Sequence, residues 1–247
     1  MRYAIFSDVH AYPPALERVL KDAEAQRADM KICLGDVVGY GPDPAGAVAL
    51  CRDACDVVVA GNHDAAVSGR INSSTFNLRA REAVSWHRDM LSEGDLAWLA
   101  TLPMSDVRED FIAVHGEVHQ RGGRLAAGFG YVIEAFGASR VFMALPPEIN
   151  MVFIGHTHVT DVWTLGGRVP ARDFIRRPGG RYIVNVGAVG YPRFQRETTY
   201  VIYDSDEGVV TFRRIPFDFA DYARAMEELG AEPPLWVADY LEGRTRR

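Results

Sequence analysis

The stretch VVVAGNHDAAV, residues 57–67, joins a short apolar run to three consecutive polar residues. The valines at 57–59 predict a buried β-strand, and Gly61 is expected to let the chain turn sharply where that strand ends. An amide, an imidazole and a carboxylate follow at once, in Asn62, His63 and Asp64. We interpret the strand as a rigid mount that presents these three side chains at its carboxyl end.

The valine strand is the third in a regular alternation of strands and helices. Apolar periodicity predicts strands at 2–7, 30–35 and 57–60 and helices at 15–26 and 43–54. Asp43 is expected to cap the second of these helices, ahead of a proline suited to the first helical turn. This order predicts a parallel sheet that is covered by helices.

The second half of the chain is expected to be mostly β. Residues 75–101 predict helix, with Ser92 opening its second part. Past residue 104 the strand-length runs lie at 104–109, 111–115, 151–155, 161–165, 181–187, 198–204 and 208–215. Hairpin turns are expected at 165–167 and 204–208, and one helix at roughly 130–139. We predict an α/β fold of one domain, 1–247, in which two packed sheets lie between helices and two short helices form an extension at about 217–247.

Composition limits the classes of protein that this chain can belong to. Its 247 residues are 48% apolar, which is enough to bury a sizeable core, and the formal charge is −6. This charge argues against an extended nucleic-acid surface or an anionic membrane surface. No apolar run has the length of a signal peptide or a membrane span, so a cytoplasmic location is expected. The three cysteines do not form a disulfide framework and are interpreted as buried thiols.

Polar side chains follow five of the predicted strands where each strand ends. They are Asp8 and His10, Asp36, the Asn62–Asp64 triplet, His115, and His156 and His158. Because the carboxyl ends of strands in such sheets gather along one edge, we expect these side chains to lie close together. Residues two apart on an extended backbone point the same way. That spacing applies to Asp8 and His10, and again to His156 and His158.

This collection of side chains predicts a metal centre. Five of the seven histidines lie at these strand ends, together with the carboxylates of Asp8 and Asp36 and the amide of Asn62. Mixed nitrogen and oxygen ligands suit manganese, iron or zinc. The set exceeds what one tetrahedral zinc needs, but it suffices for two ions that share a carboxylate. The other two histidines fall outside this pattern: His87 is expected to be exposed on a helix, and His119 is interpreted as a bystander.

Together these blocks resemble the calcineurin-like metallophosphoesterases. The matching motifs are D-x-H at 8–10, G-D at 35–36, G-N-H-D at 61–64, H-G at 115–116 and G-H-T-H at 155–158. Within that superfamily the chain is similar to compact single-domain bacterial and archaeal members, including phosphodiesterases and some dinucleoside-polyphosphate hydrolases. The resemblance implies a four-layer αββα sandwich of two mixed sheets flanked by helices.

The resemblance also implies a role for each side chain of the collection. One metal ion would be held by Asp8, His10 and His158. A second would be held by Asn62, His115 and His156. Asp36 would bridge the two ions. His63 would face the substrate as the catalytic group, with Asp64 accepting a hydrogen bond from its other ring nitrogen and raising its pKa.

The activity implied is the hydrolysis of a phosphate ester, as in a phosphodiesterase, by in-line attack of a hydroxide that bridges two divalent ions. Manganese is the preferred metal, and iron, zinc or nickel are compatible. A phosphomonoesterase and a dinucleoside-polyphosphate hydrolase are alternatives within the same chemistry. A non-catalytic protein-binding scaffold is the alternative from another class. We expect a small phosphate ester or a nucleotide as substrate, no membrane partner, and no particular oligomeric state.

Three further features are expected near the substrate. Arg193 is placed to reach a phosphate or a base, although a solvated arginine is the simpler interpretation. Tyr40 is expected either to line the substrate cleft or to pack on the adjacent helix, and Asn62 to contact substrate as well as metal. The glycine-rich residues 117–130 are interpreted as a loop that acts as a flexible lid.

Overall fold

Strand β1 (Arg2–Phe6) lies inside the first sheet of the computed structural model, which describes residues 1–193, 195–232 and 234–242. Side chains on a strand alternate between the two faces of its sheet. Ala4 and Phe6 accordingly pack in the core beneath the helices, whereas Tyr3 and Ile5 pack in the core between the two sheets. The alternation along this one strand therefore requires a layer on each of its sides.

The first sheet has six strands, in the order β11-β14-β13-β1-β2-β3. Its other strands are β2 (Met30–Cys33), β3 (Val57–Val58), β11 (Phe174–Ile175), β13 (Glu197–Asp204) and β14 (Val209–Pro216). β1, β2 and β3 run parallel, as predicted, and β13, β14 and β11 pair antiparallel. The sheet is therefore mixed, and its parallel part ends at one edge.

The second sheet also has six strands, in the order β10-β9-β12-β8-β5-β4. They are β4 (Ser105–Val107), β5 (Phe111–Val114), β8 (Met151–Ile154), β9 (Thr160–Thr164), β10 (Gly167–Val169) and β12 (Tyr182–Val186). β5, β8 and β12 run parallel to one another. Phe111 and Phe153 face the first sheet, while Ile112 and Val152 face away from it.

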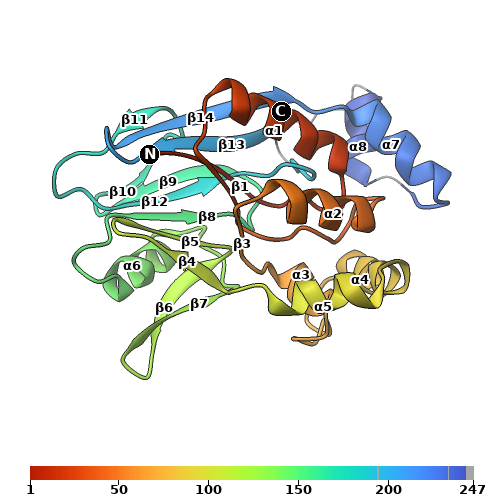
Figure 1. Cartoon of the computed structure of the whole chain (residues 1–247), viewed down its shortest axis with the longest axis horizontal. Coiled ribbons are helices and arrows are strands. Elements are labelled where there is room, and N and C mark those ends of the chain that lie inside the picture. The colour runs from red at the N-terminus through yellow and green to blue at the C-terminus, as the bar shows by residue number, and fades with distance from the viewer. Residues whose placement is uncertain (194, 233, 243–247) are drawn as a thin grey trace.

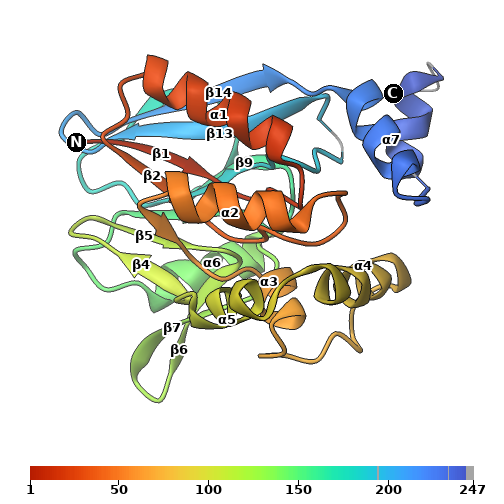
Figure 2. The same ribbon diagram turned by 45° about the vertical axis from the view of Figure 1, so that its right-hand side comes forward.

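Helices cover the outer face of each sheet (Figure 1). α1 (Pro13–Ala25) and α2 (Pro44–Ala54) lie over the first sheet, and α6 (Ala135–Ala144) lies over the second. The turned view in Figure 2 shows α3 (Asn62–Val67), α4 (Leu78–Met90) and α5 (Glu93–Thr101) together below α2. The structure thus has the predicted four layers, helix, sheet, sheet and helix. No helix in the described ranges is long and apolar enough to cross a bilayer.

Both predicted helix caps are confirmed. The Asp43 side chain accepts a hydrogen bond from the backbone N–H of Gly46, and the Ser92 side chain accepts one from Asp95. The extension predicted at about 217–247 contains two helices, α7 (Phe219–Glu228) and α8 (Leu235–Leu241). Residues 243–247 of that prediction lie outside the described ranges.

Two predictions for residues 117–139 were wrong. The presumed loop is a hairpin of β6 (Glu117–Arg121) and β7 (Arg124–Gly128), paired antiparallel. Its turn is Gly122-Gly123, where both φ angles are positive, and such a glycine pair suits a two-residue hairpin turn. The helix begins at Ala135 rather than near 130.

Gly130 lies against the Glu117 carboxylate, where a Cβ would come within 2.4 Å of the carboxyl carbon.

Tyr203 of the first sheet contacts residues of the second sheet, so a substitution there tests how the two sheets are held together. It is buried in β13, packs edge-on to Phe111, and its hydroxyl donates a 2.6 Å hydrogen bond to Asp110. We expect Tyr203→Phe to lower the free energy of unfolding by about 1–3 kcal/mol, because the hydroxyl's hydrogen bond to a carboxylate is lost. Urea denaturation at pH 7 measures the change. Tyr3→Phe is the control, since the Tyr3 hydroxyl donates to the weakly accepting Met1 sulfur.

The stability difference between wild type and Tyr203→Phe should also depend on pH. Burial, followed by the Asp110 carboxylate, raises the pKa of Tyr203 above its usual value. A group whose pKa is raised by folding contributes fully below its unfolded pKa, about 10 for tyrosine, and loses that contribution as the pH rises. The difference in stability between wild type and Tyr203→Phe should therefore narrow above pH 10. A difference that stayed constant to pH 11 would contradict the assignment.

Candidate functional site

The polar side chains predicted to converge do meet at one edge of the two sheets. They follow β1, β2 and β3 in the first sheet and β5 and β8 in the second. All nine are buried: Asp8, His10, Asp36, Asn62, His63, Asp64, His115, His156 and His158. Burial of so many polar groups is costly unless they have partners, so their mutual contacts decide what the site can do.

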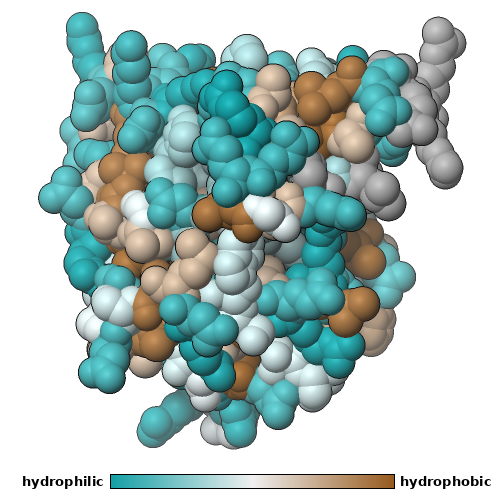
Figure 3. Space-filling view, turned by 90° about the vertical axis from the view of Figure 1, so that its right-hand side faces the viewer, coloured by the Kyte–Doolittle hydropathy of each residue, from teal (hydrophilic) through white to brown (hydrophobic). Residues whose placement is uncertain are grey.

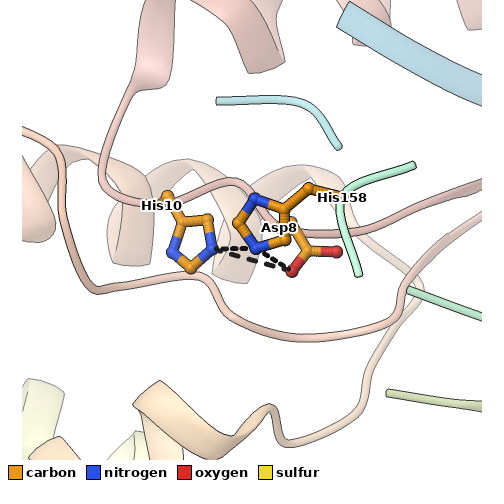
Figure 4. A group of neighbouring side chains, drawn as sticks. All are labelled: Asp8, His10 and His158. Atoms are coloured by element: carbon orange, nitrogen blue, oxygen red, sulfur yellow. Dashed lines mark hydrogen bonds and ion pairs between the residues drawn. The ribbon is translucent and has the colours of Figure 1, made fainter. Parts of the chain in front are cut away.

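The first group of side chains is Asp8, His10 and His158. The Nε2 atoms of His10 and His158 lie 3.1 Å apart. Asp8 Oδ1 lies 3.2 Å from the Nε2 atom of His158 and 3.6 Å from that of His10. Figure 4 shows these three atoms turned toward one another. Three ligand-type atoms therefore surround one point.

The second group is Asp36, His115 and His156. His115 Nε2 lies 3.0 Å from His156 Nδ1 and 3.3 Å from Asp36 Oδ2. The amide oxygen of Asn62 joins this group at 3.0 Å from the same His115 nitrogen. These are the residues that the sequence assigned to a second ion, with Asp36 among them.

Asp36 lies between the two groups. Its Oδ2 atom is 3.7 Å from His10 Nε2 in the first group and 3.3 Å from His115 Nε2 in the second. Its Oδ1 atom accepts a 2.8 Å hydrogen bond from the backbone N–H of His63. Burial raises the pKa of Asp36, but the neighbouring His115 outweighs this and holds the pKa below its usual range. An ionised oxygen is thus directed at both groups.

Backbone carbonyls orient three of the histidines. The Nδ1–H groups of His10, His115 and His158 donate to the carbonyls of Val38, Leu34 and Tyr191, at 3.1, 2.9 and 2.7 Å. A neutral imidazole whose Nδ1 carries the proton has its lone pair on Nε2. Each of these rings therefore presents Nε2 to the site, the arrangement typical of metal-ligating histidine.

The donor set fits divalent cations. Because His10 and His158 both donate through Nδ1, their Nε2 lone pairs face each other at 3.1 Å. Asp8 Oδ1 accepts no hydrogen bond from the described residues, whereas Asp8 Oδ2 accepts one from the backbone N–H of His156. A buried polar atom without a partner costs about 1–3 kcal/mol. A cation at each group would satisfy these atoms together.

The backbone at the site is not extended, contrary to the geometry assumed from the sequence. Asp8, His10, Asp36, His156 and His158 all have positive φ, between 46° and 69°. The prediction that residues two apart share a side because the chain is extended was therefore wrong in its premise. At the ends of β1, β2 and β8 the side chains converge because the backbone enters the left-handed region. Such strained backbone is characteristic of functional sites.

Gly61 has a different role from the one predicted. Its φ is −89°, so it is not in the left-handed conformation that glycine favours. A Cβ at this position would lie 2.1 Å from Asp36 Oδ1. Gly61 is required because the Asp36 carboxylate packs directly on the backbone there.

The predicted hydrogen bond between Asp64 and His63 is absent, so that prediction was wrong. Asp64 Oδ1 accepts from the N–H of Val38 at 3.1 Å, and Oδ2 accepts from the N–H of Gly61 at 2.9 Å. The carboxylate lies in the first turn of α3 and satisfies backbone donors there. Burial lowers the pKa of His63 to about 3 and raises that of Asp64 to about 6. His63 is therefore a neutral imidazole in the field of these side chains.

A cavity of about 480 Å³ opens over the two groups. Tyr40 and Arg193, both predicted near the substrate, lie on its wall together with His63. Arg193 donates to the Tyr40 hydroxyl at 3.2 Å, and its guanidinium lies 5.6 Å from the Tyr40 ring centre. Phe76, Phe129 and Tyr131 complete the aromatic part of the lining. Sequence reasoning missed these three because an aromatic residue beside a turn usually packs in a core.

His87 is buried, so the prediction that it is exposed was wrong. Its Nδ1 accepts a hydrogen bond from the N–H of Gly39, and its Nε2 donates to the carbonyl of Gly41, both at 2.9 Å. Burial lowers its pKa to about 4. His119 is on β6, 3.9 Å from the Glu117 carboxylate, and does not line the cavity.

Comparison with known proteins identifies the superfamily. The family model for the calcineurin-like phosphoesterase superfamily domain matches residues 1–208. A metallophosphoesterase from Sphaerobacter thermophilus is 36% identical, with a TM-score of 0.81 over 96% of this chain and 97% of that one. A hypothetical protein from Pyrococcus horikoshii shares the fold at 16% identity, with a TM-score of 0.73 over 96% of both chains. An uncharacterized protein from Methanocaldococcus jannaschii is 27% identical over 96% of each sequence. The chain therefore belongs to the calcineurin-like phosphoesterase superfamily, whose fold and motifs its sequence resembles.

Proposed function

We propose that this protein hydrolyses phosphodiesters with the help of two divalent metal ions. The observation that carries the proposal is the position of Asp36 Oδ2, which is within 3.7 Å of a ligand nitrogen in each of the two groups. A shared carboxylate between two sets of nitrogen and oxygen donors is the arrangement that a two-metal phosphoesterase needs. The 36% identity to a metallophosphoesterase supports this class of chemistry.

Each group would hold one ion. Asp8, His10 and His158 would bind the first, while Asn62, His115 and His156 would bind the second, with Asp36 shared. When bound, the ions would polarise the phosphate and lower the pKa of a water molecule. Carbonyl-bound Nδ1–H groups keep the ligand rings in place, as described above for His10, His115 and His158.

His63 would assist the departing oxygen. Its ring lines the cavity, next to the shared carboxylate that accepts its backbone N–H. Because its pKa is about 3, the ring acts as a neutral hydrogen-bond donor rather than as an imidazolium. Asp64 would act indirectly, by holding Val38 and Gly61 in place.

Arg193 would bind a phosphate oxygen or the leaving group. Its guanidinium is anchored over the Tyr40 and Tyr191 rings, at 5.6 and 5.4 Å from their centres. A charge held against two ring faces is pre-positioned at the cavity wall. Tyr40 thereby orients Arg193 and lines the substrate cleft, and Asn62 contacts the same cavity.

A second candidate is hydrolysis of a dinucleoside polyphosphate. It is favoured by the aromatic side chains around the cavity, namely Tyr40, Phe76, Phe129 and Tyr131. Tyr131 is 57% exposed and already stacks on the His156 ring at 3.9 Å, so its other face is available to a planar group. The ratio of kcat/KM for diadenosine tetraphosphate to that for bis-p-nitrophenyl phosphate distinguishes the two candidates.

A non-catalytic protein-binding scaffold is the alternative function. Such a surface typically shows one large apolar patch. On the face toward which the parallel strands run, hydrophobic side chains form several separate patches among hydrophilic ones (Figure 3). Every expected ligand position is also present, which favours catalysis.

The direct test is hydrolysis by protein that has been stripped with a chelator and then reconstituted. We expect turnover of bis-p-nitrophenyl phosphate to return with Mn²⁺, and to saturate at two equivalents per chain. Parallel reconstitution with iron, zinc or nickel tests the preference for manganese. Absence of metal-dependent turnover on diesters, monoesters and dinucleotides would refute the proposal and favour the scaffold.

The cytoplasmic location of this protein stays a prediction.

Removing His63 tests its part in leaving-group departure. We expect His63→Ala to keep both metal equivalents but to lower kcat on an unactivated diester by about 10²–10³-fold, the usual worth of one positioned hydrogen-bond donor to developing charge. His119→Ala, on the β6 hairpin, is the matched control and should retain wild-type kcat. Wild-type turnover by His63→Ala on methyl phenyl phosphate would contradict this role.

Neutralising Asp36 tests the shared carboxylate. We expect Asp36→Asn to bind fewer than two metal equivalents, with affinity at the weakened site reduced at least about 10-fold, because one charged ligand is lost. Metal content after gel filtration measures this directly. Asp22→Asn is the control, since Asp22 pairs with Arg213 outside the site. Two full equivalents on Asp36→Asn would exclude the bridging role.

A further inference from the structure

His87 connects helix α4 to the segment Gly39–Gly41, which follows Asp36 in the chain and carries Tyr40 of the cavity wall. Its Nδ1 accepts from Gly39 N–H and its Nε2 donates to the Gly41 carbonyl. One imidazole thus holds both ends of a three-residue turn whose own hydrogen bond, from Gly41 N–H to the Gly39 carbonyl, is 2.8 Å long. The ring is fully buried, so water does not compete for these bonds.

These two bonds require one form of the ring. The N–H of Gly39 needs an acceptor and the carbonyl of Gly41 needs a donor, so Nδ1 must carry a lone pair and Nε2 a proton. Both nitrogens are then occupied by the backbone. His87 is therefore unable to act as a ligand, and its role must be exerted through the turn.

The turn packs directly against His63. Gly39 has a φ of +94°, and a Cβ there would lie 2.2 Å from His63 Nδ1. The ring of Tyr40 in the same turn is 4.7 Å from the His63 ring. His63 Nδ1 has no hydrogen-bond partner among the described residues. Packing, not a hydrogen bond, therefore holds the nitrogen that faces this turn.

A second contact on the His63 ring comes from the residue that precedes the N-cap of α4. Phe76 directly precedes Asn77, the N-cap of that helix, and its ring lies 5.2 Å from the His63 ring. The His63 imidazole is thus contacted by two segments that α4 holds, one through its N-terminus and the other through His87. A shift of the turn would remove the packing against His63 Nδ1.

We propose that His87 is a positioning residue for His63, acting through the Gly39–Gly41 turn. The proposal rests on the proposed function, in which His63 assists the departing oxygen. Displacement of a catalytic group by about 1 Å can cost on the order of 10²-fold in rate. The consequence should appear in leaving-group departure, and metal binding should be unaffected.

Two substitutions separate positioning from bulk packing. His87→Leu keeps apolar volume but removes both hydrogen bonds, whereas the amide of His87→Gln offers an acceptor to Gly39 and a donor to Gly41. We expect His87→Leu to lower kcat on methyl phenyl phosphate by about 10–100-fold. On methyl p-nitrophenyl phosphate, whose leaving group needs little assistance, the loss should stay below about 3-fold. His87→Gln should recover most of the rate on both substrates.

A double-mutant cycle provides the decisive readout. If His87 acts through His63, adding His87→Leu to His63→Ala should change kcat by less than about 2-fold, because the group being positioned is already gone. Multiplicative losses, an equal loss on both esters, or a His87→Gln variant as slow as His87→Leu would overturn the proposal. Should His87→Leu fail to fold, His87→Asn, whose shorter amide cannot span both backbone groups, is measured on the same two esters; an equal loss on both esters would overturn the proposal.

Failure of this inference is distinguishable from failure of the proposed function. Wild-type protein that shows no metal-dependent turnover would refute the function itself. Wild-type protein that is active, with two metal equivalents retained in His87→Leu and unchanged leaving-group dependence, would refute only the positioning role. Metal content and thermal midpoint are measured for every variant.

Discussion

The carboxylate of Asp36 is the contact on which the site depends, because it joins the edges of the two sheets. One oxygen is fixed by the backbone N–H of His63, and the other faces His10 from the first sheet and His115 from the second. Asp8 repeats this arrangement, with one oxygen bound by the backbone N–H of His156 in the second sheet. Each carboxylate is thus aimed by a main-chain donor, which leaves its second oxygen directed at nitrogen ligands. The contacts that bridge the two sheets are therefore also the contacts that assemble the two groups of side chains.

Left-handed backbone at the strand ends is the energetic cost of this convergence. Each such non-glycine residue costs on the order of 1–3 kcal/mol, and it persists only where the surroundings over-determine it. Here the surroundings are further main-chain bonds, which continue the pairing of β1 and β2 beyond the strands. Asp8 N–H donates to the Gly35 carbonyl and His10 N–H donates to the Asp36 carbonyl, each at 2.9 Å. β1 and β2 are themselves held by the core between the sheets, where Phe111, Phe153 and Tyr203 are in contact.

What could be predicted from the sequence was determined by local pattern. Strands such as β5 and β8 are continuous apolar runs, so their positions and the polar residues that follow them were found within about two residues. The predictions that failed depended on contacts between distant segments. Asp64 was assigned to His63, but its oxygens are taken by the N–H groups of Val38 and Gly61. The hairpin turn at Gly122-Gly123 did carry a local signal, which was read as flexibility instead of as a two-residue turn.

The buried histidines divide according to the backbone groups that they meet. His10, His115 and His158 each meet a carbonyl at Nδ1, so the remaining nitrogen is free to face an ion. His87 meets an N–H at Nδ1 and a carbonyl at Nε2, so neither nitrogen remains available. All four are equally polar in the sequence and equally buried in the fold. Whether a buried histidine has a nitrogen left for an ion or serves only as structural support is therefore decided by the main-chain groups, which saturate one ring nitrogen or both. This depends on the tertiary path of segments 34–41 and 191, not on the histidines themselves.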